Sequence, residues 1–178
     1  MELTDVLLTF AQAAMVIAGF GGVVVTFNDK SDKWGDWDRI QFRSILDVSG
    51  IIIFFSVLPI VLQSLFDAGK SWQISILLFA VIHALTIVSY RLSVEPESIP
   101  AIFKRSHIVA GLIIVAQLIS GVLGDHGFIQ VTYSLGLIWL VGVGGWLFYL
   151  LAIGVPPRAR TNDLSNLVAG QVAAGQWL

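Results

Sequence analysis

Long apolar runs alternate with short charged segments along this 178-residue chain. No Asp, Glu, Lys or Arg occurs in five stretches, 6–28, 48–66, 71–90, 106–124 and 126–157. A helix needs about 20 residues to cross the hydrocarbon layer of a membrane. Each stretch is close to that length or longer, so the pattern predicts five membrane crossings.

The crossings are predicted to be helices. Strands of a membrane barrel alternate apolar and polar residues, whereas runs such as Ile51–Phe55 are continuously apolar. Inside lipid a helix satisfies its own backbone hydrogen bonds. We therefore expect an all-α, polytopic membrane protein whose spans are about 4–27, 42–66, 72–92, 107–124 and 128–155.

These spans fill residues 1–157, which we expect to form one transmembrane domain. Residues 158–178 would be a cytoplasmic tail. Its apolar residues recur at near-helical spacing, so either a short amphipathic helix on the membrane surface or a frayed end is consistent with the sequence.

Positive charge predicts the orientation. Nine of the ten Lys and Arg residues fall in alternate gaps, and Lys70 stands alone on the other side. The nine are Lys30, Lys33, Arg39, Arg43, Arg91, Lys104, Arg105, Arg158 and Arg160. Cytoplasmic loops carry the excess of Lys and Arg. The N-terminus should lie outside and the C-terminus inside, in a membrane that we expect to be a prokaryotic inner membrane.

Composition narrows the function classes. Only 12% of residues are charged, about half of the usual share in soluble domains. The net charge of −2 and the lack of a basic patch argue against a nucleic-acid partner. There is no cysteine, and the three histidines fall at different depths, so we expect neither a metal site, a cofactor nor an enzyme.

Polar residues inside the spans are the functional candidates, because they are costly in lipid. His83, Gln12, Gln63 and Gln117 come from four different spans, and Asp47 lies near the inner surface. They could line a water-filled path, with His83 as a protonatable gate. Alternatively, the glutamines and His83 form interhelical hydrogen bonds, and Asp47 pairs with Arg43 or a basic loop residue.

The first inside loop, 28–41, offers a second candidate site. Its aspartates could bind a divalent cation, or Asp36 or Asp38 could cap the following helix.

Two rows of small residues recur every four positions. They are Ala14, Ala18 and Gly22, and Ala116, Ser120 and Gly124. Such rows let helices approach closely in lipid, and they predict a homo-oligomer.

The resulting hypothesis is a homo-oligomeric channel or pore for an ion or small solute. The alternative is a non-conducting membrane anchor, assembly subunit or partner-triggered effector. In that alternative, the cytoplasmic loops and tail would bind a cytoplasmic protein.

Overall fold

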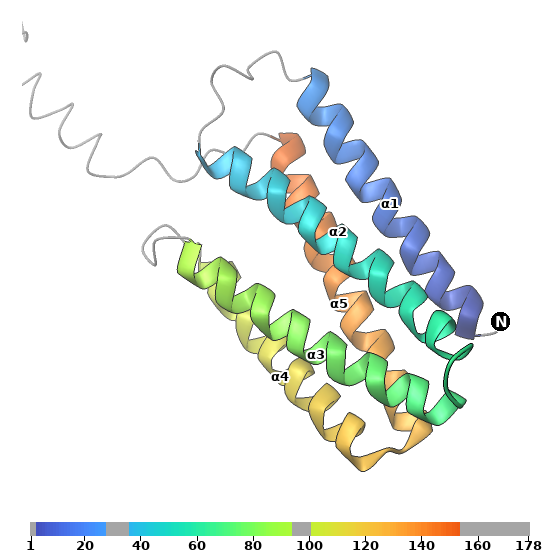
Figure 1. Ribbon diagram of the computed structural model, residues 1–178. Helices are drawn as coiled ribbons and strands as arrows, with labels where there is room; N and C mark the ends of the chain where they lie inside the picture. The colour runs from blue at the N-terminus through green and yellow to red at the C-terminus, as the bar shows by residue number, and fades with distance from the viewer. Residues whose placement is uncertain (1–2, 28–35, 94–100, 154–178) are drawn as a thin grey trace, which may run out of the picture.

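The computed structural model describes residues 3–27, 36–93 and 101–153, and they form five helices (Figure 1). The helices are α1 (Leu3–Phe27), α2 (Asp36–Leu62), α3 (Ala68–Ser93), α4 (Ala101–Leu123) and α5 (His126–Ile153). No strand occurs among these residues. The all-helical prediction with five long apolar helices is confirmed.

Several helix bounds differ from the prediction: α2 ends at Leu62 rather than near residue 66, α3 begins at Ala68 rather than near residue 72, and two starts differ by six residues. Helix α2 begins at Asp36 rather than near Phe42, and α4 begins at Ala101 rather than near His107. Hydropathy identifies the part of a helix that lipid would surround, whereas the backbone hydrogen bonds continue into polar residues outside that part. The predicted inside loop at 93–106 is therefore shorter than expected.

Short capped connections join the helices at one end of the bundle. Asp67 accepts a hydrogen bond from the backbone N–H of Lys70 at 2.9 Å, and Asp125 accepts one from that of Phe128 at 2.7 Å. Each carboxylate thus satisfies a backbone donor in the first turn of the following helix. Gly124 follows the end of α4 with φ of 72°, a conformation that suits glycine.

Helix α5 contacts all four other helices and holds the bundle together. The pair α1 and α2 lies on one side of α5, and the pair α3 and α4 lies on the other (Figure 1). The chain reverses after every helix, so α2 and α4 begin at the end where α1, α3 and α5 finish. We call this the basic end, because Arg39, Arg43 and Arg91 lie near it; Lys70 lies near the opposite end.

The largest apolar core lies between α2, α3 and α5 toward the opposite end. Phe55, Trp72, Phe79 and Tyr133 are nearly inaccessible there. A smaller core around Ile45, Leu147 and Leu151 lies near the basic end. The two cores are separate clusters of buried residues.

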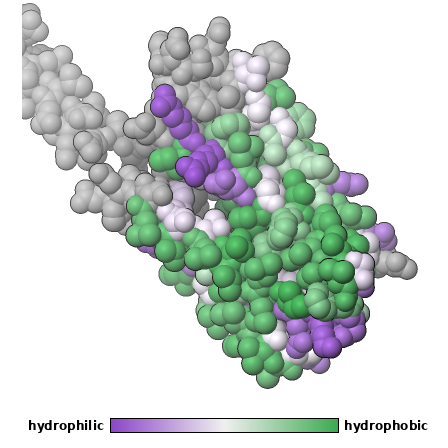
Figure 2. Space-filling view, in the orientation of Figure 1, coloured by the Kyte–Doolittle hydropathy of each residue, from purple (hydrophilic) through white to green (hydrophobic). Residues whose placement is uncertain are grey.

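Large apolar side chains are exposed along all five helices, including Phe20, Phe54, Leu85, Leu112 and Val131. Figure 2 shows such residues covering the middle of one face, with hydrophilic residues gathered toward its ends. All five helices are also long and apolar enough to cross a membrane. Five long apolar helices with an exposed apolar surface of this extent are compatible with a multi-pass membrane protein.

The small residues have different surroundings from one another. Ala14 is buried, whereas a Cβ added at Gly22 would meet nothing within 4 Å. The close approach occurs at Gly21 instead, where an added Cβ would lie 3.5 Å from the Ile45 side chain. Ala18 and Ala116 are half-buried.

A candidate solute site at the basic end

A cavity of about 520 Å³ lies among α2, α3, α4 and α5 toward the basic end. Its polar lining includes Arg43, Ser44, Asp47, His83, Thr86 and His107. Its apolar lining includes Ile51, Ile82, Ala110, Leu140, Val143 and Leu147. We call this volume the basic-end cavity.

Helical periodicity explains why these residues share one cavity. On α2 the lining residues Ile40, Ser44, Val48 and Ile51 recur every three or four positions, as residues on one face of a helix do. Helix α3 contributes a wider surface, which includes most residues from Ile82 to Tyr90. The two helices meet near their short connection and diverge toward the basic end (Figure 1).

His83 lies at the inner part of this cavity. The side chain is only 3% exposed, and its ring stacks on that of Phe79 with centroids 5.8 Å apart. Nδ1 of His83 has no hydrogen-bond partner within the described part of the chain. The hydroxyl of Thr86 donates to the carbonyl oxygen of Ile82 at 2.8 Å, so it does not serve His83.

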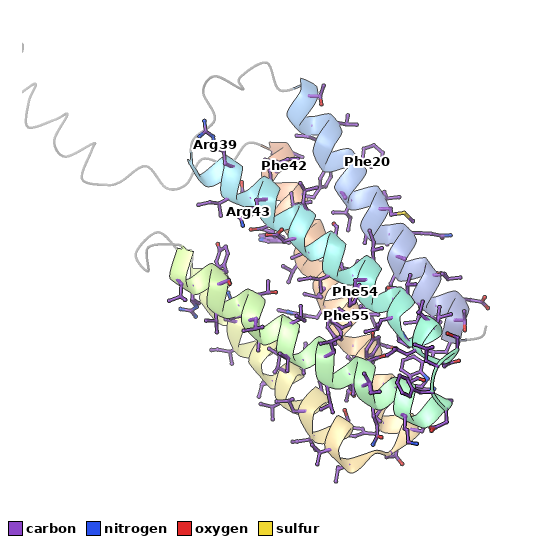
Figure 3. All side chains as sticks on the ribbon, in the orientation of Figure 1. Phe20, Arg39, Phe42, Arg43, Phe54 and Phe55 are labelled. Atoms are coloured by element: carbon purple, nitrogen blue, oxygen red, sulfur yellow. The ribbon has the colours of Figure 1, made fainter. Side chains whose placement is uncertain are left out.

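Arg43 and Asp47 lie at the mouth of the basic-end cavity. Nε of Arg43 is 3.7 Å from Oδ2 of Asp47, and both side chains are largely exposed. Figure 3 shows Arg43 projecting from α2 on the side where α3 lies. Since this distance exceeds that of a hydrogen bond, the pair is a loose one-turn ion pair.

Stacked aromatic rings lie beyond the inner part of the cavity. Phe55 and Phe79 stack with centroids 4.6 Å apart, and Tyr133 meets Phe79 edge-on at 5.2 Å. The Tyr133 hydroxyl also donates a hydrogen bond to the carbonyl oxygen of Phe55. These three residues, called here the aromatic floor, do not line the cavity; Phe55 and Phe79 lie one helical turn beyond its lining residues Ile51 and His83.

Three buried polar side chains, those of Gln117, Ser120 and Thr132, lie on the other side of the aromatic floor. Gln117 is fully buried, and neither amide atom has a hydrogen-bond partner among the described residues. Its amide nitrogen occupies the space that a Cβ on Gly136 would need. Ser120 and Thr132 share a buried hydrogen bond of 2.8 Å between α4 and α5, so Ser120 of the second small-residue row joins these two helices.

The structure brings two of the five predicted polar candidates into one site. His83 and Asp47 both line the basic-end cavity. Gln117 is buried beyond the aromatic floor, whereas Gln12 and Gln63 are exposed outside the cavity. These two glutamines therefore do not share a site with His83 in one copy of the chain.

Sequence reasoning missed His107, Tyr90 and the aromatic floor. His107 and Tyr90 line the cavity, and their rings are 5.9 Å apart. The sequence did contain a signal for the hydrogen bond at the aromatic floor. Because Pro59 has no backbone N–H, it cannot donate to the carbonyl oxygen of Phe55, four residues earlier. A buried carbonyl oxygen without its helical donor needs another one, and a tyrosine hydroxyl can donate to it.

The possible divalent-cation site in the loop 28–41 and the possible amphipathic helix in the tail 158–178 are not tested by this structure. Among the side chains that the structure describes, which exclude those of residues 28–38, no three of His, Cys, Asp or Glu are grouped as metal ligands. Most of the loop 28–41, proposed as a divalent-cation site, and all of the tail 158–178 lie outside the described residues.

Comparisons with protein-family models, with curated proteins and with solved structures gave no match. The cavity and its lining are accordingly the basis for a functional proposal.

Proposed function

We propose that the protein passes a small solute across the membrane, with the basic-end cavity as its entrance. The observation that carries this proposal is the cavity itself, about 520 Å³ in volume and lined by Asp47 and His83. Small-molecule sites typically have volumes of about 300–1,000 Å³. Polar side chains within a membrane bundle are costly and mark solute paths.

The solute would meet the aromatic floor after entering. The Phe55–Phe79 stack lies one helical turn beyond the cavity lining, and in this proposal it blocks the solute path in a closed state. Opening would require these rings to separate. The buried amide of Gln117 and the hydroxyls of Ser120 and Thr132 would then offer hydrogen bonds on the far side.

The basic end faces the cytoplasm in this proposal. Excess Lys and Arg on that side supports this orientation through the rule for cytoplasmic loops. A prokaryotic inner membrane remains the expected location. The cavity would therefore collect solute from, or deliver it to, the cytoplasmic side.

A homo-oligomer is part of the same proposal. An added Cβ at Gly19 or Gly22 would meet nothing within 4 Å, so this small-residue surface of α1 is open in a single copy. A second copy could pack closely there. Replacing Gly22 by Leu should then lower the oligomer mass in detergent, and an unchanged mass would contradict this part.

Flux into proteoliposomes tests solute passage. Wild-type protein should admit at least one of K⁺, Cl⁻ or glycerol between pH 5 and 8. Ser44→Trp should reduce that flux, because Ser44 lines the cavity. Val61→Trp is the matched control on the exposed surface of the same helix. Absence of flux for all three probes with folded, inserted protein would refute the proposal.

A further inference from the structure

We propose that the solute of the basic-end cavity is a phospholipid with a zwitterionic headgroup, which enters sideways from the bilayer between α2 and α3. This inference rests on the proposed function, since it names the solute class for the same cavity. It is argued from the position of the opening, the charges at the mouth and the polar group inside.

The cavity extends to the flank of the bundle. Leu85 lines the cavity and is also 56% exposed. It lies eight positions before Ser93, the last residue of α3, which is about 12 Å along a helix. Asp47 lines the same opening from α2, eleven positions after Asp36, about 16 Å from the helix start. Asp47 immediately precedes the charge-free stretch of α2 that begins at residue 48, so an opening at this level meets the headgroup region of the predicted inner leaflet.

The walls suit an acyl chain. Ile51, Ile82 and Leu140 line the inner part, with Val143 and Leu147 along α5. Because a lipid chain is as apolar as these side chains, the lateral opening lets it enter without crossing water. A metal ion lacks suitable ligands here, since no group of three His, Cys, Asp or Glu side chains occurs among the described residues.

The charges at the mouth favour a zwitterion. Arg43 and Asp47 are the charged side chains that line the cavity, one positive and one negative. Their 3.7 Å separation leaves the ion pair loose. A guanidinium binds phosphate oxygens through charge-assisted hydrogen bonds, and a carboxylate binds an ammonium group in the same way. A headgroup such as phosphoethanolamine offers both partners, whereas the phosphoglycerol headgroup has the phosphate alone and would leave Asp47 without a cationic partner.

A buried polar atom of His83 supports a bound ligand independently of the charges at the mouth. Its side chain is 3% exposed and lines the cavity, and its Nδ1 has no partner in the described part of the chain. Buried polar atoms are normally hydrogen-bonded. The ester groups of a phospholipid lie on the tail side of its headgroup. With the headgroup at Arg43, an ester oxygen would be placed toward His83.

Lipid retention by the purified full chain tests this inference. The protein is incubated with phosphatidylethanolamine and phosphatidylglycerol of identical acyl chains, and bound lipid is measured by native mass spectrometry. Retention of the zwitterionic lipid should exceed that of the anionic lipid by about tenfold, the effect of one charge-assisted interaction. Equal retention, or a preference for the anionic lipid, would overturn the inference.

Two variants and one control test whether the preference for the zwitterionic lipid arises at the basic-end cavity. Asp47→Asn should shift retention toward phosphatidylglycerol, since Arg43 then acts alone. Ser44→Trp should reduce retention of both lipids, whereas Val61→Trp on the exposed surface should not. Helical content by circular dichroism confirms folding in each case. A preference unchanged in Asp47→Asn would contradict the inference.

The retention assay separates this inference from the proposed function, because it requires no transport. Zwitterionic lipid retained without flux of K⁺, Cl⁻ or glycerol would refute passage of these water-soluble solutes and leave the lipid site standing. Flux of a water-soluble probe by a protein that retains both lipids equally would refute only the lipid site.

Discussion

The hydroxyl of Tyr133 on α5 donates a hydrogen bond to the backbone carbonyl oxygen of Phe55 on α2. In an uninterrupted helix this carbonyl would accept from the residue four positions later, which is Pro59. Proline has no N–H, and Pro59 lies inside α2. A gap in the hydrogen bonding of one helix is thus filled by a side chain of another, at the aromatic floor of the cavity.

Tyr133→Phe should lower the free energy of unfolding by about 1 kcal/mol, since it removes the hydroxyl and keeps the ring. In a Pro59→Ala background the loss should be smaller, because the introduced alanine would supply a helical N–H to the carbonyl of Phe55. Denaturant unfolding of the four proteins in detergent measures the coupling. Additive effects would show that Pro59 and Tyr133 act independently.

Gly136→Ala should destabilise the bundle or weaken the packing of α4 on α5. An added Cβ would collide with the Gln117 amide nitrogen and lie 2.8 Å from the Phe79 ring, and overpacking typically costs about 1–3 kcal/mol. Gly142→Ala on the same helix is the control, because its Cβ would meet nothing within 4 Å. Similar unfolding free energies for both variants would contradict the close approach at Gly136.

Phe55→Leu should increase solute flux in proteoliposomes, because a smaller side chain no longer stacks on Phe79 across the floor. Phe54→Leu is the matched control. Phe54 is the neighbouring residue on α2 and is 52% exposed, whereas Phe55 is 1% exposed. A flux that rises equally in both variants would indicate a general leak rather than a gate at Phe55.

Ionisation of Asp67 should make the stability of the folded protein depend on pH. The backbone N–H of Lys70, followed by its side chain, holds the pKa of Asp67 below its ordinary value of 3.8. A lowered pKa in the folded state means that the carboxylate stabilises the fold above the ordinary value and loses this effect as pH falls through the lowered pKa. The stability difference between wild type and Asp67→Ala should therefore be constant above about pH 5 and shrink below it.

Thermal unfolding of both proteins between pH 3 and 7 measures this difference. Lys70→Met serves as the control, because it keeps the backbone N–H that is the larger cause of the pKa shift. Most of the pH dependence should remain in that variant. A difference between wild type and Asp67→Ala that persists unchanged at pH 3 would contradict the role of the ionised carboxylate.

The orientation can be tested cleanly because the chain contains no cysteine. In intact cells a membrane-impermeant maleimide should label Lys70→Cys, which lies in an exposed position in the first turn of α3. Arg91→Cys, near the other end of α3, should react only after permeabilisation. The reverse labelling pattern would place the N-terminus inside.

Hydropathy predicted the helices well because the tendency of an apolar segment to leave water is a local property. Whether Ile51–Phe55 prefers lipid depends on those residues alone, so all five apolar helices could be identified. Helix starts were less accurate, since Asp36 continues α2 outside the apolar segment. The polar candidates were chosen by depth, and depth alone did not separate His83, which faces the cavity, from Gln12, which is exposed.

The helical class, the number of apolar helices and the asymmetry of positive charge follow from the order of residues along the chain. That His83, His107 and Asp47 share one cavity and that Gln117 lies outside it is visible only in the packed bundle. Which face of a helix points inward depends on its rotation and tilt against its neighbours. Small residues such as Gly136 and long-range hydrogen bonds such as that of Tyr133 set these angles, and their partners are distant along the chain.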